Sequence, residues 1–206
     1  MWNDHVPGAP VKAVLKGADG SVMSARMGRA CGTIPASSIV PALTNEPRAE
    51  LERTMIRAAH LATVVPALAG PLDELMGLLE PAFTATAGRP LRAVHGAPHH
   101  EQWLTTGVDV GLVDFDGMGL GDPELDVATF QAEMDFERGI AVGADRICRA
   151  FLDGYETTAG RLDHRLLTAY RALKRMHKAA RTAQAIRADG AERAARHLRR
   201  ALDVYS

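Results

Sequence analysis

The sequence predicts an α+β fold that is mostly helical, with one small β-hairpin region, and three observations lead to this prediction. Apolar residues recur every three to four positions over long stretches after residue 45, which is the period of amphipathic helices. Short, β-branched apolar runs occur near residues 11–25 and 91–113. The 206 residues are 47% hydrophobic and 24% charged, so the chain can bury one sizeable core and lacks a disordered composition.

The N-terminal part of the chain predicts a small β element. Residues 11–25, VKAVLKGADGSVMSA, have the pattern of two short strands around a Gly-Ala-Asp-Gly-Ser turn. We therefore expect residues 1–25 to form a remnant hairpin or hinge, and residues 26–206 to form a helical lobe. Because the composition supports a single core, both parts are expected to belong to one domain.

Six segments after residue 45 have the apolar spacing of helices. Asp122 is a candidate N-cap for the third of them, and Asp189-Gly190 separates the last two. Their expected bounds are 45–65, 71–83, 123–136, 146–157, 164–188 and 191–204.

Polar side chains gather in the segment between residues 91 and 126, where the short strands lie. Strands are expected at Leu91–Val94, Trp103–Leu104 and Val108–Val113. Hairpin pairing brings strand ends together, so we expect the polar groups before the middle strand and after the last strand to face one cleft. The first group is His95, His99, His100, Glu101 and Gln102, and the second is Asp114, Asp116, Asp122 and Asp126.

The residues of this segment also carry a family resemblance. HGAPHHEQWL (95–104) resembles the HGDxHxxN or HGDxHxxQ loop of the aminoglycoside phosphotransferase family, which includes choline, homoserine and maltose kinases. GLVDFDGMGLGDPELDVATF (111–130) resembles the family's DFx metal-binding turn and its GDPxxDLA segment. The resemblance covers about forty residues and implies the C-terminal lobe of a protein-kinase-like fold, with the small hairpin region holding the site.

The resemblance also implies roles for individual residues. Gln102 and Asp114 would be Mg²⁺ ligands, with Asp116 beside them in the cofactor site, since this ion prefers hard oxygen donors. His95 would pack under the loop, while Asp126 would hydrogen-bond the loop backbone and Asp122 would be structural. The family's proton-accepting aspartate is the third residue of the HGD triplet. Here that residue is Ala97, which has no group to accept a proton.

These features predict a truncated small-molecule phosphotransferase that is inactive or nearly so as this chain. No glycine-rich phosphate loop precedes the helical segments, so we expect weak binding of Mg²⁺ and ATP. Glu101 and Asp116 are nearby carboxylates, but we interpret them as a solvated loop charge and a metal or turn residue. Two alternatives remain open: an active ATP-dependent kinase of a small hydroxylated acceptor, completed by a missing N-terminal lobe or carrying an engineered Ala97, and a non-catalytic binding module that uses the old cleft.

Composition sets further expectations about partners and location. A net charge of −1 gives no general attraction to nucleic acid or membrane, and an unpaired lobe face would favour self-association. The N-terminus lacks a signal-peptide pattern, so we expect a cytoplasmic protein. Three histidines within six residues, together with Asp114, could also be drawn as a zinc site. The resemblance disfavours that site, because the family holds no metal through these histidines.

Overall fold

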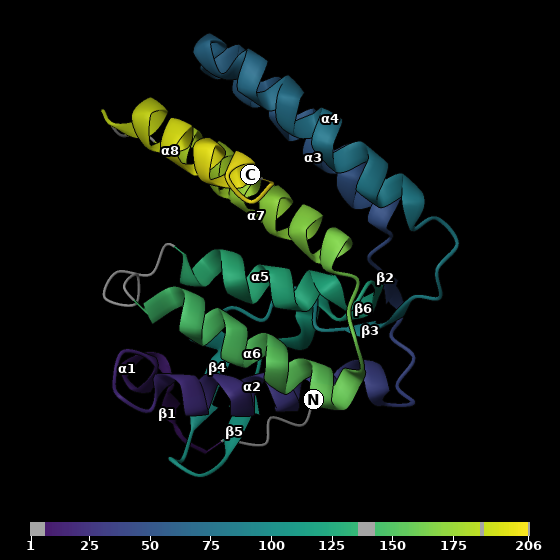
Figure 1. The fold of residues 1–206 in the computed structure, drawn as a ribbon, viewed down its shortest axis with the longest axis vertical. Helices are drawn as coiled ribbons and strands as arrows, with labels where there is room; N and C mark the ends of the chain where they lie inside the picture. The colour runs from purple at the N-terminus through teal and green to yellow at the C-terminus, as the bar shows by residue number, and fades with distance from the viewer. Residues whose placement is uncertain (1–6, 136–142, 186–187, 206) are drawn as a thin grey trace. The chain divides into compact units, whose positions relative to one another are not determined.

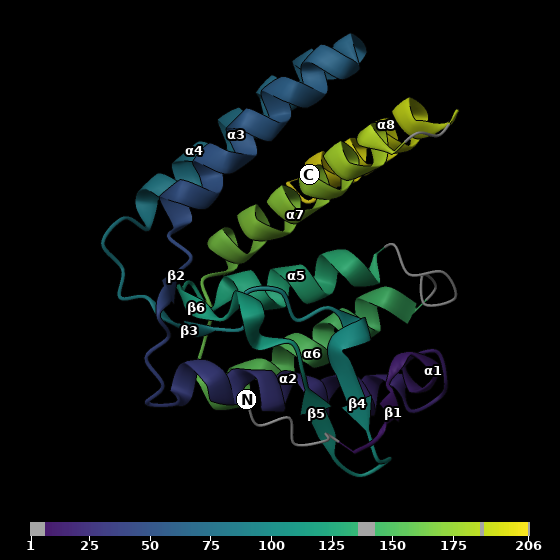
Figure 2. The same cartoon turned by 180° about the vertical axis from the view of Figure 1, so that it is seen from behind.

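The computed structural model describes residues 7–135, 143–185 and 188–205, which are mostly helical. The chain divides into two compact units (Figures 1 and 2). The first unit consists of residues 1–44 and 91–162, and the second consists of residues 45–90 and 163–206. None of the described helices is long and apolar enough to cross a membrane.

The helices of the first unit include a pair with very close backbones, α2 and α6, which lie side by side in both views (Figures 1 and 2). Gly28 and Gly154 sit at their crossing: a Cβ atom on Gly28 would collide with the Phe151 carbonyl, and one on Gly154 would collide with the Ala25 carbonyl. Only glycine allows helix backbones to approach this closely. The bounds of the helices are α1 (Lys12–Leu15), α2 (Gly20–Ala36), α5 (Glu124–Met134) and α6 (Ala144–Ala159).

The hairpin expected at residues 11–25 is wrong. These residues form α1 and the start of α2, which continues through position 25 to Ala36. Val11 and Leu15 are both buried, and their spacing of four residues places them on one face of a helix rather than on one face of a strand. A short apolar run of this kind is compatible with a strand or with a helix, and here the burial of Val11 and Leu15 on one helical face favours the helix.

Two small three-stranded sheets complete the first unit. The first has the order β1-β4-β5, and the antiparallel β4–β5 hairpin pairs Trp103 with Leu112. The second has the order β2-β6-β3, so β3 pairs with β6 and is not part of the hairpin, contrary to the single hairpin region that the sequence predicted. The strands are β1 (Ala9–Pro10), β2 (Leu43–Thr44), β3 (Arg92–Val94), β4 (Trp103–Thr105), β5 (Val110–Leu112) and β6 (Gly119–Gly121).

An aromatic cluster forms the core between the β4–β5 hairpin and helices α5 and α6. The rings of Phe130 and Phe151 stack with centroids 3.9 Å apart, and Trp103 meets Phe151 edge-on at 6.3 Å. All three side chains are fully buried. Aromatic side chains bury large apolar areas, so this cluster anchors the hairpin that leads into the polar loops.

The second unit is helical and is built around α7, which contacts the other three helices. The rings of Phe83 on α4 and Tyr170 on α7 meet edge-on with centroids 4.8 Å apart. Its helices are α3 (Pro47–Val64), α4 (Ala69–Ala85), α7 (His164–Gln184) and α8 (Gly190–Leu202). All six helices expected after residue 45 are therefore confirmed in the two units, with shifted ends; the expected end of α5 at Phe136 lies outside the described residues.

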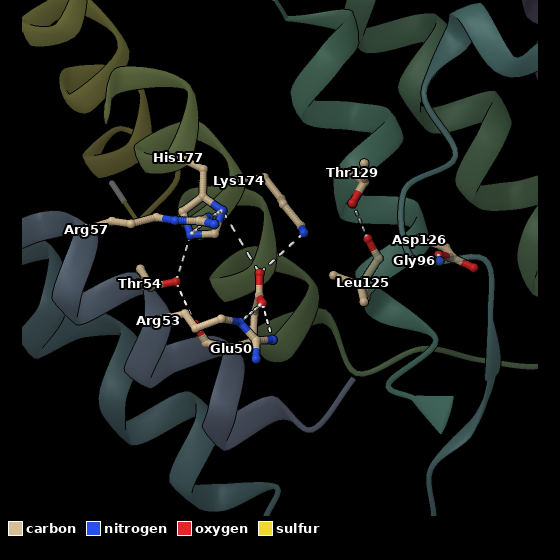
Figure 3. Close-up of polar contacts among 10 residues, drawn as sticks. All are labelled: Glu50, Arg53, Thr54, Arg57, Gly96, Leu125, Asp126, Thr129, Lys174 and His177. Carbon is tan, nitrogen blue, oxygen red and sulfur yellow. Dashed lines mark hydrogen bonds and ion pairs between the residues drawn. The ribbon is translucent and has the colours of Figure 1, made fainter. Parts of the chain in front are cut away.

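A polar cluster joins α3 to α7 (Figure 3). Glu50 accepts a hydrogen bond from Arg53 at 2.7 Å and pairs with Lys174 at 3.5 Å. The hydroxyl of Thr54 donates to the Glu50 backbone carbonyl, so it accepts from Nε2 of His177 at 2.9 Å. Arg57 donates to Nδ1 of the same ring at 2.9 Å. These partners fix His177 as the neutral imidazole protonated at Nε2.

The charges around this cluster set its pKa values. Burial, followed by the positive charges of Lys174 and Arg57, lowers the pKa of His177 to about 3, although Glu50 opposes this shift. Burial would raise the pKa of Glu50, but Lys174, Arg53 and His177 outweigh it and lower that pKa to about 2. The folded state therefore favours the deprotonated form of both side chains.

We predict that the second unit loses stability on acidification through His177. Its pKa is lower in the folded state than the ordinary value of 6.5, so its contribution is complete above pH 6.5 and is lost as the pH falls toward about 3, on the order of a few kcal/mol in total. Glu50 adds a loss in the same direction between about pH 4.5 and about 2. Urea unfolding of wild type and His177→Gln across this range should show a flatter pH profile for the variant. His60→Gln, at an exposed position on α3, is the matched control, and equal slopes for all three proteins would contradict the assignment.

We also predict a large difference between two glycine-to-alanine substitutions. Gly28→Ala should lower the free energy of unfolding by about 1–3 kcal/mol, because the added methyl group meets backbone that cannot move aside. Gly77→Ala, within α4 where nothing lies near the added methyl group, should raise it by about 0.5–1 kcal/mol. Thermal unfolding of both variants tests this, and a Gly28→Ala protein as stable as wild type would show that the helix crossing is looser than described.

Candidate functional site

A buried carboxylate on α5 holds the loop that follows β3. Oδ2 of Asp126 accepts the backbone N–H of His95 at 2.9 Å, and Oδ1 accepts that of Gly96 at 2.8 Å, and Figure 3 shows Asp126 beside Gly96. Hydrogen bonds to an ionised acceptor are about twice as strong as neutral ones. Asp126 also lies in the first turn of α5, where the helix dipole favours a negative charge. The resemblance implies that this residue holds the loop backbone, and both bonds are present.

His95 lies beneath this loop and connects it to the end of β5. Its side chain is buried, and Nε2 lies 3.1 Å from the carbonyl oxygen of Val113, so the ring donates this hydrogen bond. Burial lowers the pKa of His95, although the bond to Val113 and the charge of Asp114 oppose that shift. Phe115 packs on the ring with centroids 4.8 Å apart. The buried neutral imidazole therefore fixes the residue that precedes Asp114.

Asp114 has a backbone conformation that few non-glycine residues adopt. Its φ is 69° and its ψ is 62°, and among the described residues no other non-glycine residue has a positive φ. Such a conformation costs about 1–3 kcal/mol and is found most often at functional sites. It turns the carboxylate toward Gln102, whose Nε2 donates to Oδ2 at 2.7 Å. The two side chains that the sequence placed together are therefore in direct contact.

Gln102 ends a 3-10 turn, His100–Gln102, and caps it as well. Its Oε1 accepts the backbone N–H of His99 at 3.1 Å, and the His99 side chain accepts the N–H of Gln102, which together make a capping box. The Gln102 carbonyl accepts the N–H of Val113 at 3.0 Å, extending the β4–β5 ladder. Gln102 is buried, whereas Asp114 is exposed, so the carboxylate forms the solvent-facing side of the pair.

The other predicted residues differ in burial and in contacts. Ala97 is half-buried. Its carbonyl accepts the N–H of His99 at 2.8 Å, and the same N–H also donates to Gln102 Oε1. Glu101 is exposed, as is Asp116 in the 3-10 turn Phe115–Gly117. Asp122 is buried but does not cap α5 as expected: the cap position belongs to Pro123 and no side chain caps the helix. The Asp122 carbonyl instead accepts the N–H of Leu125, because the chain turns before the helix begins.

The chemistry of the donors decides which ion this arrangement suits. Across residues 7–135, 143–185 and 188–205, no three His, Cys, Asp or Glu side chains come together as a metal-binding group, so the loop histidines and Asp114 do not form the zinc site considered above. Mg²⁺, in contrast, keeps several waters and is usually held by one or two carboxylates plus substrate phosphates. The exposed carboxylate of Asp114, held in a fixed orientation, fits that mode of binding.

Sequence reasoning missed two features of the site. The first is the left-handed backbone at Asp114, a conformation that aspartate adopts more often than most non-glycine residues but that its residue type alone does not predict. The second is the capping box, which the sequence does indicate. A capping box has Glu or Gln three residues after the cap residue. Gln102 follows His99 by three residues, directly before the apolar pair Trp103-Leu104.

Comparisons with known proteins show the family and the fold of this chain. The model of the family described as "Phosphotransferase enzyme family" matches residues 4–161, whereas no curated protein matches the sequence. A choline/ethanolamine kinase family protein from Mesorhizobium loti superposes with a TM-score of 0.66 at 20% identity, over 97% of this chain and 66% of that one. A glucosamine kinase in complex with glucosamine, ADP and inorganic phosphate gives 0.59 at 24% identity, over 91% and 52%. A spectinomycin phosphotransferase in complex with ADP and spectinomycin gives 0.58 at 10% identity, over 97% and 68%. At these identities the structures show a shared fold, and the chain spans between half and about two thirds of their lengths.

We predict that Asp126→Asn destabilises the first unit by about 1.5–3 kcal/mol, because the amide group offers one acceptor oxygen to two backbone N–H groups and turns a donor toward one of them. Urea unfolding measures the loss, and amide hydrogen exchange at His95 and Gly96 should accelerate. Asp109→Asn, at an exposed position in the β4–β5 turn, is the control. Equal stability and equal exchange in the two variants would exclude Asp126 as the anchor of the loop.

Proposed function

Because this chain belongs to the phosphotransferase enzyme family, we propose that it supplies the catalytic-loop side of an ATP-dependent phosphoryl transfer to a hydroxyl group of a small acceptor. The observation that carries the proposal is the Gln102–Asp114 pair, held at 2.7 Å beside a loop whose backbone is fixed by Asp126. Phosphoryl transfer depends mainly on positioning and electrostatic stabilisation, and these residues provide a rigid and partly buried frame for both.

The proposed cofactors are Mg²⁺ and ATP. Asp114 would hold the ion, with Gln102 as a second ligand by resemblance and exposed Asp116 two residues away. When bound, Mg²⁺ would neutralise negative charge on the nucleotide phosphates. The complexes of the glucosamine kinase and the spectinomycin phosphotransferase contain ADP, which supports a nucleotide for this chain. The protein residues would orient the carboxylate, exclude water from beneath the loop and keep His95 neutral.

Two features support low activity for the chain by itself. By the resemblance, Ala97 stands where the family has its proton-accepting aspartate, and loss of a general base costs about 10² to 10⁴ in rate. No glycine-rich phosphate loop precedes the site, so nucleotide should bind with a dissociation constant in the millimolar range or weaker, about −4 kcal/mol. We therefore propose that the N-terminal lobe of a related kinase would complete the site.

We predict that Ala97→Asp does not restore turnover in the chain alone, because a base acts only on an acceptor already aligned with a clamped γ-phosphate. Joined to the N-terminal lobe of a related kinase, the same variant should exceed the corresponding Ala97→Asn protein by about 10² to 10⁴ in acceptor-dependent ATP turnover. Asparagine matches aspartate in size but cannot take the proton, so it is the matched control.

The measurement is an ATP turnover assay against a panel of hydroxyl acceptors, with calorimetric titration of Mg²⁺ and ATP on each protein. Tighter nucleotide binding and turnover only after fusion would support the proposal. Acceptor-dependent turnover by the unfused Ala97→Asp chain, or a low-micromolar nucleotide affinity of the unfused wild type, would show that more of the active site is present than we propose.

A further inference from the structure

We propose that Arg57, held by the neutral side chain of His177, is the centre of a binding site for the phosphate monoester group of a small molecule. This site lies in the second unit and shares no residue with the candidate metal site of the first unit, so it does not rest on the proposed function. Three features carry the inference: the neutral partner of Arg57, the excess of positive charge around Glu50, and the donors of the guanidinium that remain for a ligand.

The partner of Arg57 orients its guanidinium without cancelling its charge. Nη1 of Arg57 donates to Nδ1 of His177 at 2.9 Å, and Nε2 of the same ring donates to the Thr54 hydroxyl at 2.9 Å (Figure 3). His177 is 8% exposed, so this acceptor is buried. An arginine that pairs with a carboxylate loses most of its attraction for other anions, whereas a neutral imidazole leaves the full positive charge in place. Among the residues that the structure describes, no carboxylate forms an ion pair with Arg57.

The cluster around Glu50 holds more positive than negative charge. Arg53 and Lys174 both pair with Glu50, at 2.7 and 3.5 Å. Together with Arg57 they contribute three positive charges against one negative charge, which leaves an excess of two. A phosphate monoester carries about −1.5 to −2 charges at neutral pH and would balance this excess. A carboxylate carries a single charge and would balance half of it.

The His177 ring shows the sign of the electrostatic potential at this point. After burial, the largest effects on its pKa come from Lys174 and then Arg57, which lower it, and Arg181 acts in the same direction. Glu50 opposes them and is outweighed, so that the pKa is lowered to about 3. The potential beside Arg57 is therefore positive although a carboxylate lies in the cluster, and the ring stays a neutral hydrogen-bond acceptor at neutral pH.

The free edge of the Arg57 guanidinium has the shape that phosphate recognition requires. His177 engages only Nη1, while Nε and Nη2 form no hydrogen bond to any described residue. These two nitrogens lie on one edge of the planar group, where two parallel N–H donors match two oxygens of a phosphate. Arg57 is exposed on α3, so a solute can reach this edge. Because His177 already restricts the side chain, less conformational entropy is lost on binding.

The test is a titration of the whole chain with phenyl phosphate at neutral pH, with ¹⁵N NMR of the Arg57 Nε–H group and the His177 ring. Sodium acetate is the carboxylate for comparison, and sodium chloride at matched ionic strength controls for screening. We expect phenyl phosphate to shift both signals and to saturate with a dissociation constant of about 1 mM, and acetate to bind at least about 10-fold more weakly.

Variants separate the roles of the two residues. Arg57→Gln should weaken binding by about 10- to 100-fold and should shift the His177 Nδ1 signal before any ligand is added, because that nitrogen loses its donor. His177→Phe keeps Arg57 but removes the acceptor, and it should weaken binding by about 2- to 10-fold. Arg48→Gln, at an exposed position on the same helix where the arginine pairs with Glu52, is the matched control and should bind as wild type does.

Several results would overturn the inference. Equal shifts with sodium chloride would reduce the effect to screening, and equal affinity for acetate would exclude the phosphate class. Wild-type affinity in Arg57→Gln would exclude Arg57 as the centre of the site, and wild-type affinity in His177→Phe would exclude the anchoring role of the ring. A response confined to the loop at His95 and Gly96 would show that phenyl phosphate binds only in the first unit.

Discussion

The two hydrogen bonds from the His95 and Gly96 backbone to the Asp126 carboxylate are the interaction on which the rest of the site depends. From there a continuous series of bonds leads to the solvent-facing carboxylate: the His95 ring donates to Val113, Val113 donates to Gln102, and Gln102 donates to Asp114. Each step has one donor and one acceptor with fixed roles, so the series has a single arrangement. A buried helix residue is thereby linked to an exposed loop residue through successive hydrogen bonds.

The series contains few net charges in the interior, which explains why it can be buried. His95 stays neutral because burial lowers its pKa, and Cys31, whose sulfur lies 4.0 Å from Asp126, keeps its proton because burial and that carboxylate raise its pKa. Asp126 therefore accepts two backbone N–H groups and lies beside a thiol that stays protonated. An unpaired buried carboxylate would cost several kcal/mol, and the two backbone N–H groups offset much of that cost.

Patterns within short stretches of sequence predicted the elements whose formation depends on interactions between residues close in the chain. The six helices after residue 45 follow from apolar periodicity, and the β4–β5 hairpin follows from two short strands with a turn between them. The pairing of β3 with β6 joins residues 25 to 29 positions apart and leaves no periodic pattern in the sequence. The run Val11–Leu15 is compatible with a strand or a helix, and its burial on one helical face, together with the packing of α2 on α6, favours helices over residues 11–25. In the site, residue types indicated which side chains meet, whereas the direction of the Gln102 amide and the strain at Asp114 depend on backbone geometry that residue types do not encode.

The glycine crossing between α2 and α6 has a mechanical consequence for this site. Proteins lose volume under hydrostatic pressure mainly where their interiors hold voids, and a crossing in which backbone lies on backbone has no void to lose. At Gly32, a Cβ atom would already lie 2.7 Å from the Tyr155 carbonyl. Cys31, next to Gly32 on α2, is the residue whose sulfur contacts Asp126. A backbone contact without room for a Cβ atom therefore lies one residue away from the side chain that touches the carboxylate fixing the loop, so pressure should find little void to remove behind that carboxylate.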